Sequence, residues 1–177
     1  MALSLAEFDR MVSDHGPVLY RIAYRMVGDR HEAEDLVQET FRSAWKSRDL
    51  FRPGGGERAW LAAILRHRVA DHRRRPKPPI VLDPDNGFES GRTDRDAFED
   101  ELSDEVQWAV EQLPHDMRET LLLVVVGELT HHEAADLLKI PLGTVLSRVS
   151  RARQRLRKFL LTGSRRGTDN QEITDGA

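Results

Sequence analysis

Six positively charged side chains and no negatively charged one lie between Pro141 and Leu161, in the run PLGTVLSRVSRARQRLRKFLL. Guanidinium and ammonium groups bind phosphate oxygens, and neighbouring serine and threonine hydroxyls hydrogen-bond to the same oxygens. These residue types therefore favour the binding of a polyanion, and duplex DNA is the polyanion that a basic helix fits. The alternative interpretation is a solvated basic face on an ordinary bundle helix.

The spacing of the apolar residues in this segment predicts a helix with one buried stripe. The stripe consists of Val145, Val149, Ala152, Leu156 and Phe159. Another face carries four side chains that we expect to contact DNA: Thr144, Ser147, Arg148 and Arg151. Thr144 lies in the first turn, where backbone N–H groups and the helix dipole favour phosphate. An arginine on this face can bind the O6 and N7 atoms of guanine.

The residues before this helix predict the scaffold of a helix-turn-helix. Thr130 and Glu133 have the spacing of a capping box, which predicts a short helix from there to Leu138. Residues 139–141 then form a short turn, and an apolar helix is predicted upstream within residues 113–127. In a helix-turn-helix the second helix of the motif enters the major groove of DNA. The segment therefore predicts a DNA-binding module.

The N-terminal part of the chain also has helical periodicity. Helices are predicted over residues 5–15, 18–27, 33–45 and 60–69, with breaks at Gly16-Pro17, at Gly28-Asp29 and in the glycine-rich loop 52–56. The third of these helices has acidic and amide side chains on its outer surface, and the fourth ends in the basic run RHRVADHRRR. The predicted fold class is therefore all-α.

Charge is segregated along the 177 residues, whose net charge is −3. Residues 1–79 carry +4, residues 80–112 carry −9 and residues 113–177 carry +2. The acidic stretch is rich in proline and glycine and has little apolar periodicity, so it cannot bury enough surface to offset its ordering entropy. We therefore predict two small helical domains, at residues 1–75 and 104–161. A flexible acidic linker at 76–103 joins them, and a disordered tail follows at 162–177.

Other chemistries lack the residues that they need. The chain has no cysteine, so neither a disulfide nor a cysteine-based zinc site is possible. His131 and His132 diverge by about 100° on a helix, and His67 and His72 are five residues apart, so neither pair converges on a metal ion. No phosphate-binding loop with its lysine and no GxSxG nucleophile is found. We therefore predict no catalytic activity, metal or cofactor.

A carboxylate-dependent hydrolase is the alternative among enzymes, but the acidic residues cluster in a linker too mobile to fix catalytic geometry. No apolar run approaches the roughly twenty residues of a membrane span, and the N-terminus lacks the apolar core of a signal peptide. We expect a soluble, cytoplasmic protein without membrane insertion.

Four segments in this order resemble an extracytoplasmic-function (ECF) sigma factor of bacterial RNA polymerase, in the sigma-70 superfamily. They are AEDLVQETFRSAW, FRPGGGERAWLAAILRHRVADHRRR, LPHDMRETLLL and PLGTVLSRVSRARQRLR. The resemblance covers nearly all of residues 5–161. It implies a region-2 helical bundle that binds core RNA polymerase and the promoter −10 element, and a region-4 helix-turn-helix that recognises the −35 element. It also implies control by an anti-sigma factor.

The match to DLVQE implies that Asp35, Leu36, Gln38 and Glu39 bind core polymerase, on the coiled coil of its largest subunit; the polymerase flap is a further expected contact. Elementary electrostatics agrees, because an acidic helix face would be repelled by DNA and should meet protein. The alternative for these residues is an ordinary solvated helix face.

The glycine-rich loop and the helix after it look like the element that captures unpaired bases of the −10 element. Cations would bind the phosphates and planar groups the unstacked bases. The resemblance implies contacts from Arg58, Trp60, Arg66, His67, Asp71 and Arg74, although Trp60 is also a candidate core residue.

Two positions depart from the family pattern. His67 stands where many members have Asn, and Leu146 stands where members usually have Lys or Arg. Both departures affect base preference and leave the fold untouched. We expect the chain to bind core polymerase and direct promoter-specific initiation; the alternative is a two-domain helix-turn-helix regulator that acts without polymerase binding.

Overall fold

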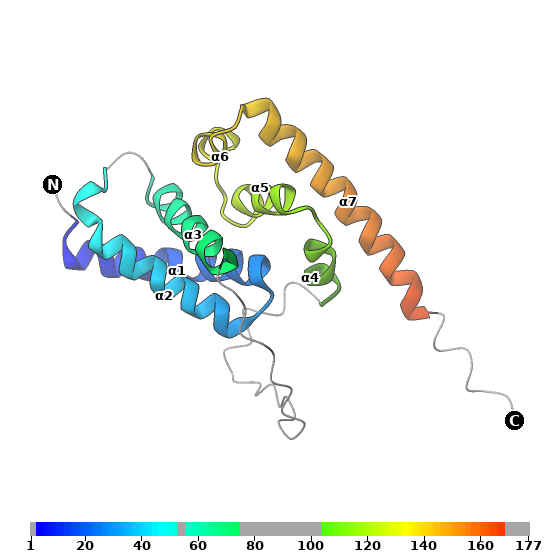
Figure 1. Ribbon diagram of the computed structural model, residues 1–177, viewed down its shortest axis with the longest axis horizontal. Coiled ribbons are helices and arrows are strands. Elements are labelled where there is room, and N and C mark those ends of the chain that lie inside the picture. The colour runs from blue at the N-terminus through cyan, green and yellow to red at the C-terminus, as the bar shows by residue number, and fades with distance from the viewer. Residues whose placement is uncertain (1–2, 53–55, 75–103, 169–177) are drawn as a thin grey trace, which may run out of the picture.

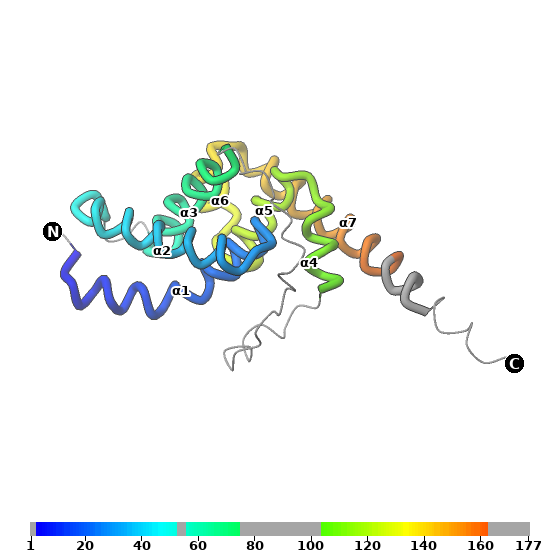
Figure 2. Tube along the Cα trace, turned by 60° about the horizontal axis from the view of Figure 1, so that its bottom comes forward, coloured from blue at the N-terminus to red at the C-terminus, as the bar shows by residue number. Residues whose placement is uncertain are grey.

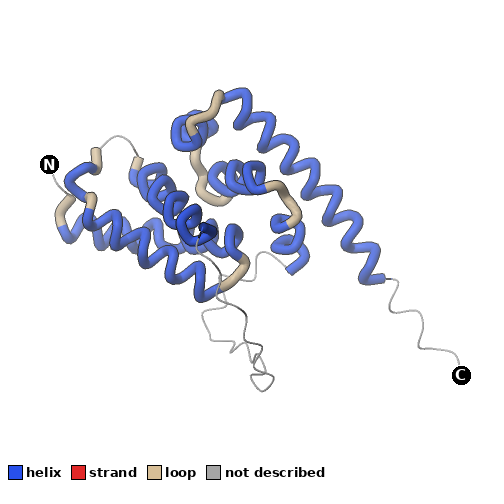
Figure 3. Tube along the Cα trace, in the orientation of Figure 1, coloured by secondary structure: helices blue, strands red, loops and turns tan. Residues whose placement is uncertain are grey.

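The computed structural model describes residues 3–52, 56–74 and 104–168, with side chains as far as Thr162. All regular elements in these ranges are helical, which confirms the all-α prediction (Figure 3). The elements are α1 (Leu5–Val27), α2 (Arg30–Lys46), the short 3₁₀ helix η1 (Arg48–Leu50), α3 (Glu57–Arg74), α4 (Asp104–Glu111), α5 (His115–Val125), α6 (His131–Leu138) and α7 (Leu142–Thr168). The linker predicted at 76–103 lies outside the described residues.

Helix α1 runs unbroken through Gly16 and Pro17, so the predicted break there is wrong. A proline inside a helix removes one backbone hydrogen bond and costs about 3 kcal/mol. Here Pro17 is on the exposed side, and residues on both sides of it, such as Met11 and Leu19, are each 1% exposed in the same core. Burial along the whole helix thus outweighs the local penalty, and α1 ends where Gly28 adopts φ 77°.

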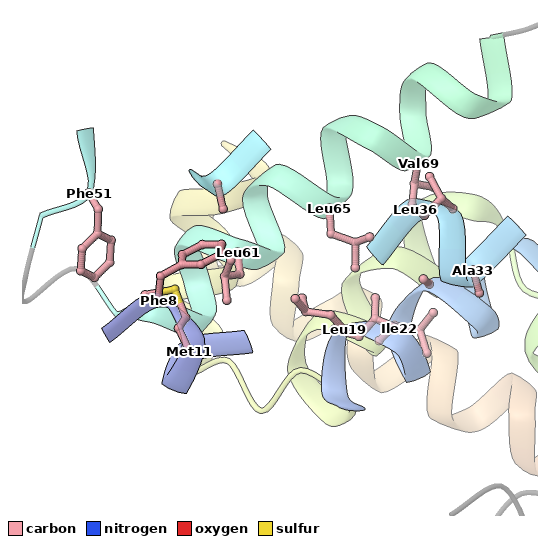
Figure 4. Close-up of a cluster of buried hydrophobic side chains, with 13 residues drawn as sticks. Phe8, Met11, Leu19, Ile22, Ala33, Leu36, Phe51, Leu61, Leu65 and Val69 are labelled. Atoms are coloured by element: carbon pink, nitrogen blue, oxygen red, sulfur yellow. The ribbon is translucent and has the colours of Figure 1, made fainter. Parts of the chain in front are cut away.

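Helices α1, α2 and α3 pack around the first hydrophobic core, in which side chains from all three helices meet (Figure 4). Met11, Leu19, Leu61 and Leu65 are almost completely buried in it. The helical periodicity of residues 33–45 is confirmed, because Ala33, Leu36 and Ala44 of α2 are buried in this core. These three helices form the N-terminal half of the protein, which we define as residues 3–74.

The C-terminal half, residues 104–168, consists of α4 to α7. Its core includes Leu113, Leu121, Ala134, Ala135, Val145, Val149 and Ala152. Helix α4 was not predicted, because only two turns carry its short apolar pattern of Val106, Ala109 and Val110. The Arg118 side chain stabilises the end of α4 by donating hydrogen bonds to the carbonyl oxygens of Glu111, at 2.5 Å, and Leu113, at 3.3 Å.

Helix α7 is longer than predicted. It continues past Leu161 to Thr168, so residues 162–168 extend the helix and are not part of a disordered tail. The rest of the predicted tail, 169–177, lies outside the described residues. Adding a residue to an existing helix gains one hydrogen bond without the cost of nucleation, and no proline interrupts this stretch. The C-terminal end of α7 projects away from the other helices (Figures 1 and 2).

The two halves pack against each other. Leu122 of α5 is 3% exposed and belongs to the core of the N-terminal half. A smaller cluster joins Ala62 of α3 to Leu123, Leu129 and Leu138 of the C-terminal half. Within the residues that the structure describes, no helix is long and apolar enough to cross a membrane.

Candidate nucleic-acid and polymerase interfaces

Helices α6 and α7 form the predicted helix-turn-helix. Thr130 and Glu133 make the capping box in both directions: the Glu133 N–H donates to the Thr130 hydroxyl at 3.2 Å, and the Thr130 N–H donates to the Glu133 carboxylate at 2.7 Å. The hydrogen bonds that the Thr130 N–H and the Thr130 hydroxyl donate to the Glu133 carboxylate lower the pKa of Glu133 below its usual value. Lys139 then takes up a left-handed conformation, with φ 54°, and ends α6. The turn before α7 is therefore tight, as the motif requires.

The buried stripe of α7 is confirmed at Val145, Val149 and Ala152, which are 0–4% exposed. At 100° per residue, the face opposite this stripe is centred between Ser147 and Gln154. The side chains on and beside that outer face include Thr144, Ser147, Ser150, Arg151, Gln154 and Lys158, of which the last four are exposed. Leu146, which is 48% exposed, lies at its edge. The outer face therefore presents hydroxyl, amide and guanidinium groups to solvent.

Arg148 does not share this outer face with Arg151. It lies on the flank next to the stripe, its side chain is 24% exposed, and its Nη2 atom lies 3.0 Å from the Oδ2 atom of Asp116. Asp116 stands in the first turn of α5, where the helix dipole favours a carboxylate. The ion pair ties the recognition helix to α5, a role that the sequence pattern did not reveal.

Helix α2 presents the predicted polymerase-binding face. Asp35 and Gln38 are exposed, and the Glu39 side chain is 44% exposed, 3.7 Å from Arg42. Leu36 does not lie on this face, because it is 5% exposed in the core of the N-terminal half. Its contribution in this structure is to hold α2 against α1 and α3 while the polar residues face outward.

Three of the residues predicted to contact the −10 element lie on one exposed side of α3. His67, Asp71 and Arg74 are exposed at i, i+4 and i+7 spacing. The Asp71 carboxylate lies 3.7 Å from the guanidinium of Arg74 and 3.8 Å from that of Arg68. This side of the helix therefore carries the His67 ring, which can stack, and the Arg74 cation in one helical row.

Trp60 packs against Phe51, with 4.9 Å between ring centroids, and lies at the edge of the first core. This supports the interpretation of Trp60 as a core residue. It fixes the start of α3 against the chain segment that precedes the glycine-rich loop.

Arg58 and Arg66 each form an ion pair with the C-terminal half, while about a third of each side chain stays exposed. The Arg58 guanidinium lies 2.5 Å from the Glu128 carboxylate, and the Nε atom of Arg66 lies 2.9 Å from the carboxylate of Glu119. The structure thus divides the predicted −10 residues into an exposed set and a set that is engaged by the other half of the protein.

A buried polar contact between the halves was missed by sequence reasoning. Arg25 of α1 is 7% exposed and donates to the Oε1 atom of Gln107 at 2.6 Å. Gln107 in turn donates to Glu111 at 2.7 Å. Burial lowers the pKa of Arg25, and the hydrogen bonds compensate for the loss of water. No local pattern could have paired residues 82 positions apart.

Two family models match the two halves of the chain. Residues 11–77 match the model described as Sigma-70 region 2, and residues 103–156 match the model described as Sigma-70, region 4.

Named relatives align over most of the chain. The ECF RNA polymerase sigma factor SigW of Bacillus subtilis (strain 168) is 34% identical over 165 residues, which cover 86% of this chain and 88% of SigW. The ECF RNA polymerase sigma factor SigE of Mycolicibacterium smegmatis is 33% identical over 162 residues, which cover 89% of this chain and 63% of SigE. The chain therefore spans less than two thirds of the length of SigE.

Solved structures agree with the sequence matches. The sigma factor RpoE from Bartonella quintana, solved in complex with the anti-sigma factor NepR, superposes with a TM-score of 0.70 at 27% identity, covering 88% of this chain and 98% of that one. CnrH, solved in complex with the cytosolic domain of CnrY, gives a TM-score of 0.68 at 26% identity, with 90% of each chain covered. From these matches, and from a helix-turn-helix that follows a three-helix core, the chain belongs to the extracytoplasmic-function sigma factors.

Proposed function

We propose that this sigma factor binds core RNA polymerase through α2, the −10 element through α3 and the −35 element through α7. The observation that carries the proposal is the contrast between two exposed helix faces, acidic on α2 and basic on α7. An acidic face meets protein more readily than DNA, and a basic face does the reverse. The protein has no catalytic role of its own in this account and acts in the cytoplasm, where it meets the polymerase and promoter DNA.

For the −35 element, we propose that α7 enters the major groove with its outer face toward the bases. Arg151 and Ser147 contact base edges, Thr144 binds phosphate at the helix N-terminus, and Leu146 packs on a thymine methyl group. Arg148 acts differently from Arg151, since its ion pair with Asp116 holds it on the flank of the helix.

For the −10 element, the exposed side of α3 supports contacts from His67, Asp71 and Arg74. The imidazole of His67 stacks on or hydrogen-bonds to an unpaired base, and Arg74 binds backbone phosphate. Arg58 and Arg66 contribute phosphate contacts once the C-terminal half releases them. Trp60 packs against Phe51 at the edge of the core and does not itself stack on a base.

We also propose regulation by an anti-sigma factor, because the solved relatives RpoE and CnrH were each captured with a protein partner, an anti-sigma factor in the case of RpoE. The observed packing of the two halves gives such a partner one compact target.

Gel filtration with core RNA polymerase tests the polymerase contact. The wild-type chain should co-elute with core polymerase, and a variant with Asp35→Lys and Glu39→Lys should not. The matched control changes Asp9→Lys and Asp14→Lys, two exposed acids of α1, and should co-elute normally. Equal loss in both variants would point to net charge instead of the α2 face. A wild-type chain that binds promoter duplex but never co-elutes would favour a conventional helix-turn-helix regulator.

A further inference from the structure

A polar contact joins the last turn of α3 to the first turn of α2. The Nε2 atom of His72 lies 3.1 Å from the Oε2 atom of Glu32, and the two side chains are 29% and 35% exposed. An imidazole with a proton on Nε2 donates to a carboxylate at this distance. Arg73 of the same turn contacts His115 of the C-terminal half. His72 and Glu32 both belong to the N-terminal half, so their contact does not depend on where the C-terminal half lies.

The contact holds a part of α3 that lies beyond the hydrophobic core. Val69 is the last buried residue in the described range of α3, and Figure 4 shows it beside Leu36 of α2 in that core. The turn after Val69 is polar and carries Asp71 and Arg74, two exposed residues of the proposed −10 side. His72 lies between them in the chain and connects their turn to α2. The position of this turn relative to α2 therefore depends on the contact with Glu32.

Glu32 lies next to the proposed polymerase-binding face of α2. At 100° per residue, it stands about 20° from Glu39 and about 60° from Asp35 around the helix axis. Its backbone N–H donates to the carboxylate of Asp29 at 2.8 Å, which caps α2 and fixes this first turn. The pair thus connects the helix that is proposed to bind polymerase with the turn that is proposed to bind the −10 strand.

We propose that His72 is a positioning residue for −10 recognition. Through Glu32 it holds the last turn of α3, with Asp71 and Arg74, in a fixed place relative to α2. A binding group that is already held in place loses less conformational freedom when its ligand binds. The inference rests on the proposed function, because it assumes that α2 binds polymerase and that α3 binds the −10 element. His72 acts through its neighbours and does not itself contact the promoter.

Removing either partner should slow promoter opening and leave polymerase binding unchanged. A partly exposed pair of this kind changes a rate by a few-fold, so His72→Ala and Glu32→Ala should each slow opening by about 1.5- to 5-fold. Because both variants break the same contact, the double variant should lose no more than either single variant does. His72→Gln should open the promoter nearly as fast as the wild type, since its amide can donate to Glu32 in place of the imidazole.

The experiment uses the full chain bound to core polymerase, on a promoter fragment that the wild-type holoenzyme transcribes. The time course of permanganate reactivity at unpaired thymines measures opening, and gel filtration with core polymerase measures binding. Ser4→Ala is the matched control for stability, because it removes the hydroxyl that caps α1 in the same half of the protein. This control should lose stability in chemical denaturation but open the promoter at the wild-type rate.

Several results would overturn the inference. Losses that add in the double variant would mean that His72 and Glu32 act separately, as they would if His72 contacted the promoter directly. A loss in His72→Gln as large as in His72→Ala, or an equal loss in Ser4→Ala, would mean that the hydrogen bond to Glu32 has no role in positioning. Weaker polymerase binding in both alanine variants would place the pair in the polymerase interface instead.

Arg74→Ala separates a failure of this inference from a failure of the proposed function. If Arg74→Ala opens the promoter at the wild-type rate, the proposed −10 role of this turn fails. A loss in Arg74→Ala without any loss in His72→Ala overturns the positioning role alone. If His72→Ala loses helicity by circular dichroism, His72→Glu serves instead, and combining it with Glu32→His should restore the opening rate that His72→Glu alone reduces.

Discussion

Arg151 and Arg148 lie three residues apart on α7 but should respond differently to substitution by alanine. Arg151 is exposed beside the outer face, whereas Arg148 is held by Asp116 at 3.0 Å and is 24% exposed. A bidentate contact between an arginine and guanine contributes about 1–3 kcal/mol of discrimination. Arg151→Ala should therefore reduce transcription from a −35-dependent promoter by roughly 5- to 150-fold and relax base preference at one position.

Arg148→Ala removes an ion pair within the protein, which is worth about 0.2–1 kcal/mol where it is partly exposed. Its effect should appear as a small loss of thermal stability and an even loss of activity on all promoters. Base preference should stay unchanged, because the position of the whole helix changes and no base contact is lost.

The assay is transcription by the reconstituted holoenzyme on a promoter set in which each −35 position is varied. Arg165→Ala provides the control, since it lies fourteen residues, or about 21 Å, further along the same helix. Equal losses at Arg151 and Arg165 would show that general basicity, and not base contact, accounts for the function of α7. A change of base preference in Arg148→Ala would refute the assignment of that residue to helix positioning.

Three further predictions concern stability and pH. Leu122→Ala should lower the free energy of unfolding, measured by chemical denaturation, by about 2–5 kcal/mol, because it empties a buried site between the halves. The control, Val125→Ala on the exposed side of α5, should change it by less than about 0.5 kcal/mol. Thr130→Ala should cost about 1 kcal/mol in the same assay by removing the cap of α6; no loss would contradict the capping box.

Burial and the adjacent Arg73 lower the pKa of His115 below the usual value of 6.5, and Arg118 adds to this effect. The negative charges of Glu119 and Asp116 act in the opposite direction but do not cancel it. The unfolded chain therefore binds the proton at higher pH than the folded chain. The contribution of His115 to the free energy of unfolding is therefore fully present above pH 6.5. It should be lost progressively as the pH falls below that value. Thermal unfolding across this range should show the loss in the wild type and less of it in His115→Gln; equal pH dependence in both would contradict the assignment.

The sequence predicted those features that depend on neighbouring residues. The α7 stripe and the Thr130 cap follow from spacings of three and four residues, and the structure confirms both. The family resemblance supplied the functional assignment that periodicity could not.

The features that were missed depend on distant residues. The contact between Arg66 and Glu119 joins positions 53 apart, so no local pattern could indicate that a proposed DNA contact is occupied within the protein. Pro17 predicted a helix break from its own conformational preference, but burial on both sides of it decided the outcome. Leu36 belongs both to the DLVQE motif, which implies a surface role, and to the apolar periodicity of residues 33–45, which predicts burial; its 5% exposure agrees with the periodicity.

Run-off transcription with purified core polymerase and genomic fragments tests the central claim most directly. Addition of the wild-type chain should produce discrete transcripts that core polymerase alone does not make. The variant with Asp35→Lys and Glu39→Lys should abolish them, and the Asp9→Lys and Asp14→Lys control should preserve them. If no discrete transcript appears with the wild-type chain, or if the transcripts persist when the α2 face is reversed, the assignment of polymerase binding and promoter selection to these surfaces is contradicted.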